Sequence, residues 1–346
     1  MPPVINAIRP AWSVPGGRVE LIGEDFPQHP SGPPRLLIGT DDAHVVASSG
    51  RRVRFVVPAS TLRGRLTVRF ADAPSASTEL VVGATVASGI HQVDNPVFDA
   101  SGQLYVTHSG TRGNKVAVPL YRIGADGARE PLAVEVGNPT SMVVGPDRTL
   151  YISSRFDGHV YRLIRDDHAD LYATELGVAT GLAFGPDGWL YVGDRAGTIL
   201  RVSPTRSVET FATLPASVAA FHLAFGPDGD LFVSAPTLAT HDPIYRITPD
   251  RMVETVYDGF GRPQGLAFDS TGALYVAEAL AGAAGLYKLD LSRTPVTAER
   301  MLSAPALIGV AFDPTAGGVI IASNDTVWRI DADVRPAAVL RSPERT

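Results

Sequence analysis

The sequence predicts an all-β protein in two parts: a small β-sandwich at residues 1–83 and a six-bladed β-propeller at residues 84–346. Three observations lead to this prediction. A motif of short apolar strands recurs six times along the chain, residues 4–82 alternate apolar and polar positions in short runs, and 34 glycines and 28 prolines supply many turns. The motif recurs at the period of a four-stranded blade, about 40–50 residues.

Each repeat has the same order of parts. An apolar strand ends at a bulky residue, which we call the anchor; a tight turn follows, and then a second strand of the Leu-Tyr-Val type. The anchors are Phe98, Val144, Phe184, Phe225, Phe268 and Phe312. A third strand alternates apolar residues with Tyr and Arg, as a half-exposed strand does, and a more variable fourth strand follows. Six such units would form a ring without a long exposed edge.

Closure of the ring has two possible solutions. Residues 85–90 and residues 337–341 both have the pattern of a fourth strand, and one of them must complete the last unit.

The N-terminal part carries several arginines on one predicted strand. Period-2 alternation places these residues on the same side, with two further arginines expected nearby. They are Arg63, Arg65, Thr67 and Arg69, with Arg52 and Arg54 as the neighbours. An anion or polysaccharide contact is one interpretation, and a solvated strand face is the favoured one. The junction at residues 81–85 has no flexible Gly/Ser tract, so the two parts are expected to pack together.

Two families resemble these segments. The repeat at residues 182–192, Leu-Ala-Phe-Gly-Pro-Asp-Gly followed by Leu-Tyr-Val, resembles the NHL-repeat and senescence-marker/gluconolactonase group of six-bladed propellers. Ile8-Arg9-Pro10, Gly16-Gly17 and Val57-Pro58 are similar to the IPT/TIG family of immunoglobulin-like domains. The first resemblance implies the propeller fold, and the second implies a spacer or docking module.

One end of the ring is the expected working face. If the innermost strand of each unit starts at this end, which we call the top face, the loops at the top differ in length between units. Length variation on one face of a repeat array marks a binding face. The positions four residues before the anchors should surround the axis there. They are Asp94, Thr140, Thr180, Phe221, Gln264 and Ile308.

The gluconolactonase-like resemblance implies one divalent cation, Ca²⁺ or Zn²⁺, held in the channel by acidic and amide side chains. The candidate ligands are Asp94, Asn95, Asp194 and Gln264. Only one carboxylate stands at the ring positions, where a hard cation prefers several, and this disfavours a metal-dependent lactonase. A second possibility is a metal-assisted lyase like virginiamycin B lyase, also a propeller, which uses His and Glu near the channel. The candidates for such an acid–base pair are His222, Glu278 and His108.

The favoured function is therefore a non-catalytic binding or scaffold protein that holds a small-molecule ligand or a protein partner at the top face. The alternatives are a lactonase-type hydrolase, a lyase, and a structural subunit of a larger assembly. The net charge is −6, with the acidic excess in the propeller, which argues against nucleic-acid partners. No apolar run is long enough to span a membrane, and no signal peptide is visible, which favours a cytoplasmic over a secreted protein.

Overall fold

The computed structural model describes residues 1–30, 32–111, 113–114 and 116–337. All regular elements in these ranges are strands, β1 to β33, which confirms the all-β prediction. Within the same ranges no helix is present that could cross a membrane.

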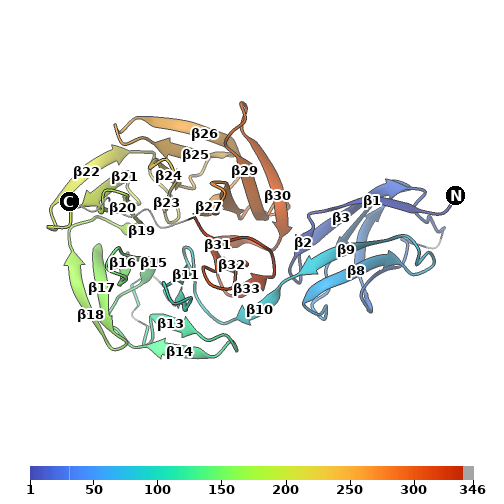
Figure 1. Ribbon diagram of the computed structural model, residues 1–346, viewed down its shortest axis with the longest axis horizontal. Helices are drawn as coiled ribbons and strands as arrows, with labels where there is room; N and C mark the ends of the chain where they lie inside the picture. Colours follow the sequence, from blue (N-terminus) through green and yellow to red (C-terminus); the bar gives the residue numbers. More distant parts are fainter. Residues whose placement is uncertain (31, 112, 115, 338–346) are drawn as a thin grey trace.

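The N-terminal part consists of two facing rows of strands (Figure 1). The first row is β1 (Val4–Arg9), β3 (Arg18–Glu24), β7 (Arg52–Val56) and β6 (His44–Ser48). The second row is β9 (Ser77–Val82), β8 (Gly64–Phe70), β4 (Leu36–Ile38) and β5 (Asp41–Asp42). Alternate apolar side chains of both rows, such as Leu21, Phe55 and Phe70, form one buried core between them. The period-2 pattern of the sequence produces this core, because successive side chains of a strand point to opposite faces.

Six four-stranded antiparallel units follow, and we number them in chain order. Unit 1 is β11 (Val97–Phe98), β12 (Leu104–Thr107), β13 (Leu120–Ile123) and β14 (Arg129–Leu132). Unit 2 is β15 (Pro139–Val144), β16 (Leu150–Ser154), β17 (His159–Arg165) and β18 (His168–Ala173). Unit 3 is β19 (Ala179–Phe184), β20 (Leu190–Asp194), β21 (Thr198–Val202) and β22 (Val208–Thr213).

Units 4 to 6 repeat this order. Unit 4 is β23 (His222–Phe225), β24 (Leu231–Ser234), β25 (Asp242–Ile247) and β26 (Val253–Phe260). Unit 5 is β27 (Pro263–Phe268), β28 (Leu274–Glu278), β29 (Gly285–Asp290) and β30 (Thr297–Ser303). Unit 6 is β31 (Leu307–Phe312), β32 (Val319–Ser323), β33 (Val327–Ile330) and, from the other end of this part of the chain, β10 (Ala84–Ala87).

The six units are arranged in a ring (Figure 1). Each innermost strand contacts the innermost strand of the next unit, and β11 of unit 1 contacts β31 of unit 6. All six anchors are the last residues of these innermost strands. A second-strand Tyr packs edge-on against the anchor of the following unit, as Tyr151 does against Phe184, with 5.0 Å between ring centroids. The same edge-on contact joins units 3 and 4, units 4 and 5 (with Phe232 in place of Tyr) and units 5 and 6.

The turn after the anchor is held by its Asp in units 1, 2, 3, 5 and 6. In unit 3, Asp187 accepts a hydrogen bond from the amide of Trp189 (3.1 Å) and another from the hydroxyl of Tyr191 (2.9 Å). Burial raises the pKa of Tyr191 to about 12, and the nearby Asp187 carboxylate adds to the rise. The Asp of the Pro-Asp-Gly motif and the Tyr of the Leu-Tyr-Val motif are thus joined by a hydrogen bond.

Strand β10 closes the ring. It pairs antiparallel with β33, with Thr85 opposite Trp328. The first of the two possible closing segments is therefore the one used. Of the other, residue 337 lies over unit 5, where its amide donates to Phe268 O (3.0 Å), and residues 338–341 lie outside the described residues.

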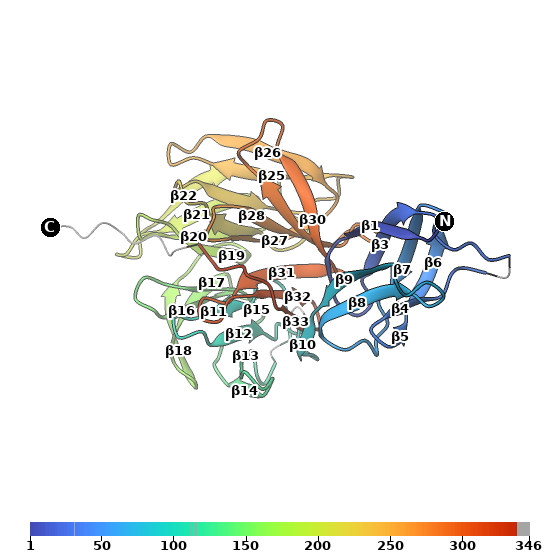
Figure 2. The same ribbon diagram turned by 45° about the vertical axis from the view of Figure 1, so that its right-hand side comes forward.

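The two parts of the chain are joined by strand pairing, as the short junction predicted. Strand β2 (Trp12–Ser13) lies parallel to β9 on one side and to β30 of unit 5 on the other, so one nine-stranded sheet runs from the N-terminal part into the ring. Figures 1 and 2 both show the N-terminal strands next to β30 and β10.

The predicted arginine face is correct for β8 and wrong for β7. Arg65 and Thr67 are exposed on β8, whereas Leu66 between them is half-buried against the core and Val68 is buried in it. Arg52 and Arg54 belong to β7 in the opposite row, where both approach Glu20 of the neighbouring strand β3. The two groups of arginines do not share a face, because period-2 alternation fixes the face within a strand but not the row to which the strand belongs.

Candidate functional site

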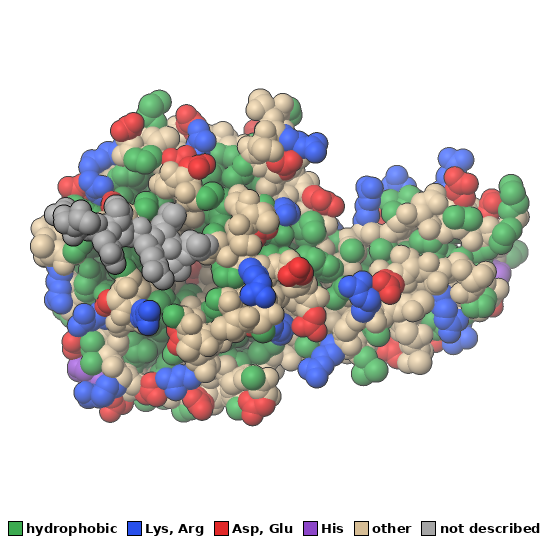
Figure 3. All heavy atoms as spheres, in the orientation of Figure 1, with side chains coloured by type: hydrophobic (Ala, Val, Ile, Leu, Met, Phe, Trp, Pro, Cys, Tyr) green, Lys and Arg blue, Asp and Glu red, His purple; other side chains and the backbone are tan. Residues whose placement is uncertain are grey.

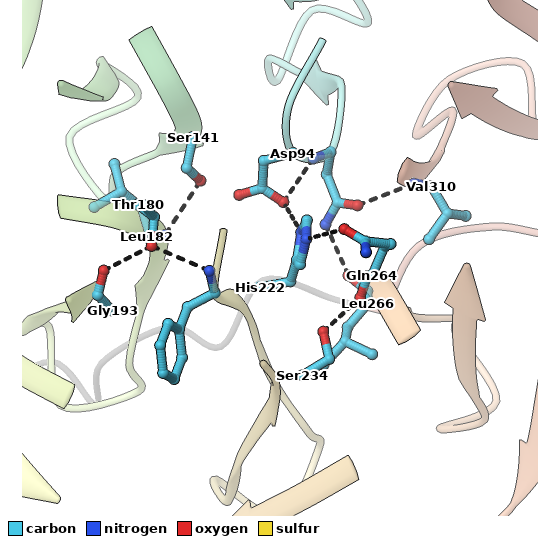
Figure 4. Close-up of polar contacts among 12 residues, drawn as sticks. Asp94, Ser141, Thr180, Leu182, Gly193, His222, Ser234, Gln264, Leu266 and Val310 are labelled. Carbon is cyan, nitrogen blue, oxygen red and sulfur yellow. Dashed lines mark hydrogen bonds and ion pairs between the residues drawn. The ribbon is translucent and has the colours of Figure 1, made fainter. Parts of the chain in front are cut away.

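Buried polar side chains surround the axis of the ring where the innermost strands begin (Figure 4). They come from units 1 to 5 and are nearly closed to solvent. They are Asp94, Thr140, Ser141, Thr180, His222 and Gln264. A buried polar group requires hydrogen-bond partners, so the contacts of each show which groups are structural and which remain available to a ligand.

Three of these side chains form a chain of hydrogen bonds across the axis. Asp94 precedes β11, His222 begins β23 and Gln264 is the second residue of β27, so three different units contribute. Asp94 Oδ1 lies 2.5 Å from His222 Nδ1, and His222 Nε2 lies 3.2 Å from Gln264 Oε1. The His222 side chain is fully buried. We call these three residues the axial cluster.

Both ring nitrogens of His222 face oxygen atoms in this arrangement. An imidazole that donates from both nitrogens carries two protons and a positive charge, which would face the Asp94 carboxylate. With the Gln264 amide turned over, its NH₂ group donates to Nε2 and the ring is neutral. In either state Asp94 fixes the orientation of the imidazole.

The axial cluster has two polar atoms that are not used inside the protein. Within the described residues no hydrogen bond reaches Asp94 Oδ2 or Gln264 Nε2. Asp94 is 3% exposed and Gln264 is 6% exposed. Figure 4 shows the free Asp94 oxygen pointing away from His222, into the space between Asp94 and Thr180. One oxygen of Asp94 and one end of the Gln264 amide, a donor or, with the amide turned over, an acceptor, are therefore available beside the axis.

The hydroxyl groups on the opposite side of the axis are used for structure. Thr180 Oγ1 donates to Gly193 O (2.8 Å) and accepts from the amide of Phe221 (3.1 Å), which ties unit 3 to unit 4. Ser141 Oγ accepts from the amide of Leu182 (3.1 Å), which ties unit 2 to unit 3.

Asn95 also has a structural contact for each of its side-chain polar atoms. Its Nδ2 donates to Leu266 O in unit 5, and its Oδ1 accepts from the amide of Val310 in unit 6, both at 2.9 Å. A Cβ at Gly265 would overlap Asn95 Oδ1, so the glycine makes room for this contact. Asn95 therefore joins units 1, 5 and 6.

The remaining predicted residues lie outside the axial cluster. Asp194 Oδ1 accepts from the amide of residue 178 (2.8 Å) and shapes a turn. Glu278 accepts from three backbone amides, those of residues 261, 262 and 280. The ring of His108 stacks on Tyr121, with 6.0 Å between centroids. No hydrogen bond found in the described part of the chain connects these three side chains to Asp94, His222 or Gln264.

The ring positions predicted in unit 4 are shifted by one residue. Phe221 was expected at the axis, but it packs in the apolar core between units 3 and 4, and His222 takes the axial place. Strand β23 pairs with β24 without an irregularity, whereas β19 and β27 each contain a bulge that ends at the second residue before the anchor, Leu182 and Leu266. A bulge adds a residue and changes the face on which earlier residues lie, so a fixed spacing from the anchor does not hold in every unit.

The donor set is a poor fit for the divalent cation implied by the gluconolactonase-like resemblance. Asp94 is the one carboxylate of the cluster, and its Oδ1 already accepts from the amide of Asn95 (2.7 Å) and faces His222. Ca²⁺ takes six to eight oxygen ligands and Zn²⁺ needs free imidazole or carboxylate donors. Across the described ranges no group of three His, Asp or Glu side chains is placed to hold a metal ion.

Comparisons with known proteins agree with this architecture. The family model described as "Strictosidine synthase-like, N-terminal" matches residues 181–202. A search of curated proteins finds no match.

Several solved structures are similar. A protein described as a candidate gluconolactonase is 18% identical, with a TM-score of 0.61 over 74% of this chain and 94% of that one. An auxiliary nutrient binding protein from Bacteroides thetaiotaomicron is 16% identical, with a TM-score of 0.55 over 96% and 98%. A catalytically inactive virginiamycin B lyase from Staphylococcus aureus, solved with quinupristin, is 15% identical, with a TM-score of 0.54 over 86% and 98%. At these identities the likeness concerns the fold alone, and the chain is an all-β protein with a propeller-like fold.

Proposed function

We propose that this protein is a non-catalytic binding protein that holds a small polar ligand at the top face of the ring, against the axial cluster. The observation that supports the proposal is the unpartnered Oδ2 of Asp94. Solvent reaches Asp94 Oδ2, so a ligand that donates to it replaces a hydrogen bond to water. The free Gln264 amide nitrogen lies in the same cluster, so a ligand group with both a donor and an acceptor, such as a hydroxyl or a carboxamide, is complementary.

Exposed apolar side chains on the top face support the same proposal. Phe156, Leu238 and Leu280 lie in loops between second and third strands. Their side chains are 50%, 89% and 45% exposed. Phe156 packs over Gly137 and Leu280 over Gly261, so both are held in place. Apolar groups around a few fixed polar atoms are typical of ligand sites, and a protein partner of the top face would contact the same side chains.

The neighbour described as a nutrient binding protein supports ligand binding, at the level of fold likeness alone. A second function, a lyase, is favoured by one observation. The carboxylate of Asp94 orients the imidazole of His222, as a carboxylate does for a histidine that acts as a general base. The virginiamycin B lyase neighbour has a similar fold. A cation-dependent lactonase has less support, because the axial cluster offers one carboxylate.

We further propose that residues 1–83 form an IPT/TIG-like immunoglobulin sandwich and residues 84–346 a six-bladed NHL- and gluconolactonase-like propeller. The common core of the two N-terminal rows and the position of β10 support this division. A chain that begins at Ala84 keeps the closing strand and should show a cooperative thermal transition. A chain that begins at Ser88 lacks it and should not. Equal behaviour of the two chains would contradict the boundary.

The binding proposal is tested with the full chain. Thermal shift and calorimetry are run with a panel of sugars, amino acids, nucleosides and hydroxy acids, and the same panel is run on Asp94→Asn. The control is Asp325→Asn, an exposed aspartate in the loop between β32 and β33. Binding that is lost in Asp94→Asn and kept in the control supports the proposal. Turnover of quinupristin or of a small lactone that is abolished by His222→Ala would instead establish an enzyme. Binding unchanged by Asp94→Asn would refute the axial site.

A further inference from the structure

A second site lies where the ring meets the N-terminal part, away from the axial cluster. A cleft of about 450 Å³ is lined on one side by strands β2, β8 and β9 and on the other by the turn after β31, strand β33 and the residues that follow β33. The volume is within the range of small-molecule sites, about 300–1,000 Å³. We call it the junction cleft. Figure 3 shows charged side chains of both signs where the two parts meet.

The junction cleft is formed by a local departure from the repeat. In unit 3 the anchor Phe184 pairs with Leu190, six residues later, whereas in unit 6 Phe312 pairs with Val319. The longer turn contains Gly317 and Gly318, with φ of 72° and 105°, so the wall of the cleft carries no side chain at these positions. The opposite wall is fixed by the pairing of β2 with β30, and the cleft is therefore present before a ligand arrives.

The side chains of the junction cleft combine an aromatic ring with donors and acceptors. Trp12 is half-buried and lines the cleft, and its indole N–H makes no hydrogen bond to any described residue. Arg65 and Arg329 also line it. Each is held by a carboxylate, Arg65 by Glu79 (3.0 Å) and Arg329 by Asp313 (2.7 Å).

Two exposed carboxylates, Asp331 and Asp333, complete the lining. Asp331 lies 3.6 Å from Arg329 Nε, and its side chain is 82% exposed. Both arginines are already paired with carboxylates, so an anion in the cleft would compete with these carboxylates. The cleft does have a flat apolar surface beside planar groups that accept and donate hydrogen bonds.

We propose that the junction cleft binds a neutral saccharide. A pyranose ring presents C–H groups on its face, which pack on an indole, and hydroxyls at its edge, which both donate and accept. Carboxylate and guanidinium groups have two parallel acceptors or donors, and adjacent hydroxyls match this spacing. Arg65 thus gains a role in a polysaccharide contact of the N-terminal part, while Arg63 and Arg69 do not line the cleft.

The test measures binding of neutral hexasaccharides of glucose, xylose and mannose to the full chain by calorimetry and tryptophan fluorescence. The blocking variant is Ala316→Arg, because Ala316 is exposed at the cleft rim and a long side chain there fills the cleft without touching a core. Ala125→Arg, at an exposed turn in unit 1, is the matched control. Trp12→Ala removes the stacking surface. Asp331→Asn with Asp333→Asn removes the two exposed negative charges of the cleft and keeps the size of both side chains.

We expect one of the hexasaccharides to bind, and both Ala316→Arg and Trp12→Ala to weaken it at least about tenfold, with Ala125→Arg unchanged. Asp94→Asn should leave this binding unchanged, which separates the junction cleft from the axial cluster. Absence of binding by all three hexasaccharides, or binding that Ala316→Arg leaves intact, overturns the proposal. Binding of spermidine that is lost on Asp331→Asn with Asp333→Asn, without saccharide binding, also overturns it in favour of an amine site.

Discussion

The hydrogen bond between Asp94 and His222 allows a quantitative prediction. Asp94 Oδ1 accepts from two groups, His222 Nδ1 at 2.5 Å and the amide of Asn95 at 2.7 Å. Asp94→Ala removes the acceptor and leaves both donors without a partner, one of them on a fully buried ring. Asp94→Asn keeps an oxygen in the same place, so it should preserve most of the stability.

The magnitude follows from the number of donors that lose their partner. A buried donor without a partner costs about 1–3 kcal/mol, and the amide of Asn95 is only half-buried. We therefore expect Asp94→Ala to lower the free energy of unfolding by about 2–5 kcal/mol and Asp94→Asn by about 1 kcal/mol. The change should depend on His222, because that side chain carries the larger part of the cost.

A double-mutant cycle by urea denaturation measures this dependence. Asp94→Ala and His222→Ala should show a coupling energy of about 1–3 kcal/mol. Asp94→Ala combined with Val53→Ala, in the core of the N-terminal part, should be additive within about 0.5 kcal/mol. If Asp94→Ala changes the stability by less than about 1 kcal/mol, or if its coupling to His222→Ala equals that of the control pair, the axial cluster does not hold the ring together as described.

Three further predictions concern the junction, the axis and the pH dependence. Gly17→Ala should destabilise the contact between the two parts by about 1–3 kcal/mol, since the added Cβ would lie 2.5 Å from Ser303 O; limited proteolysis should then cleave the N-terminal part faster, and unchanged cleavage would contradict this. Gly265→Ala should displace Asn95 and lower the midpoint of thermal unfolding, and faster amide exchange in β31 would show that unit 6 has loosened, whereas an unchanged midpoint would count against the contact. Because the pKa of Tyr191 is raised to about 12 in the fold, its contribution is complete below pH 10 and is lost as the pH rises from 10 to 12; Tyr191→Phe should flatten the fall of the urea midpoint in that range, and an identical slope would refute the assignment.

Much of the ring was predictable because one contact is repeated. An aromatic anchor, a turn Asp and a second-strand Tyr recur at the same places in most units, with Val144 as the anchor of unit 2 and Phe232 and Ile320 in place of Tyr in units 4 and 6. The choice of closing strand was not predictable, because residues 85–90 and 337–341 have the same apolar pattern. Pairing between β10 and β33 depends on where the N-terminal part positions the chain, and local sequence does not carry that information.

The axial cluster was predicted in part. Asp94 and Gln264 stand at the expected spacing from their anchors, and His222 was expected one residue inside the ring. A usable signal was present at the third position before the anchor. Units 3, 5 and 6 have a glycine there, where a Cβ would meet a neighbouring strand, and unit 4 has His222 instead. The spacing from the anchor does not show which units contain a bulge; unit 4 has none, and there Phe221 packs in the apolar core.

The pairing of β10 with β33 also sets the order in which the protein can be completed during its synthesis. Thr85 leaves the ribosome long before its partner Trp328. The N-terminal rows can fold as soon as they are made, but the outer edge of unit 6 cannot form until β33 has been synthesised. During that interval β10 is a short strand beside a finished domain, which limits the unpaired edge open to a wrong partner.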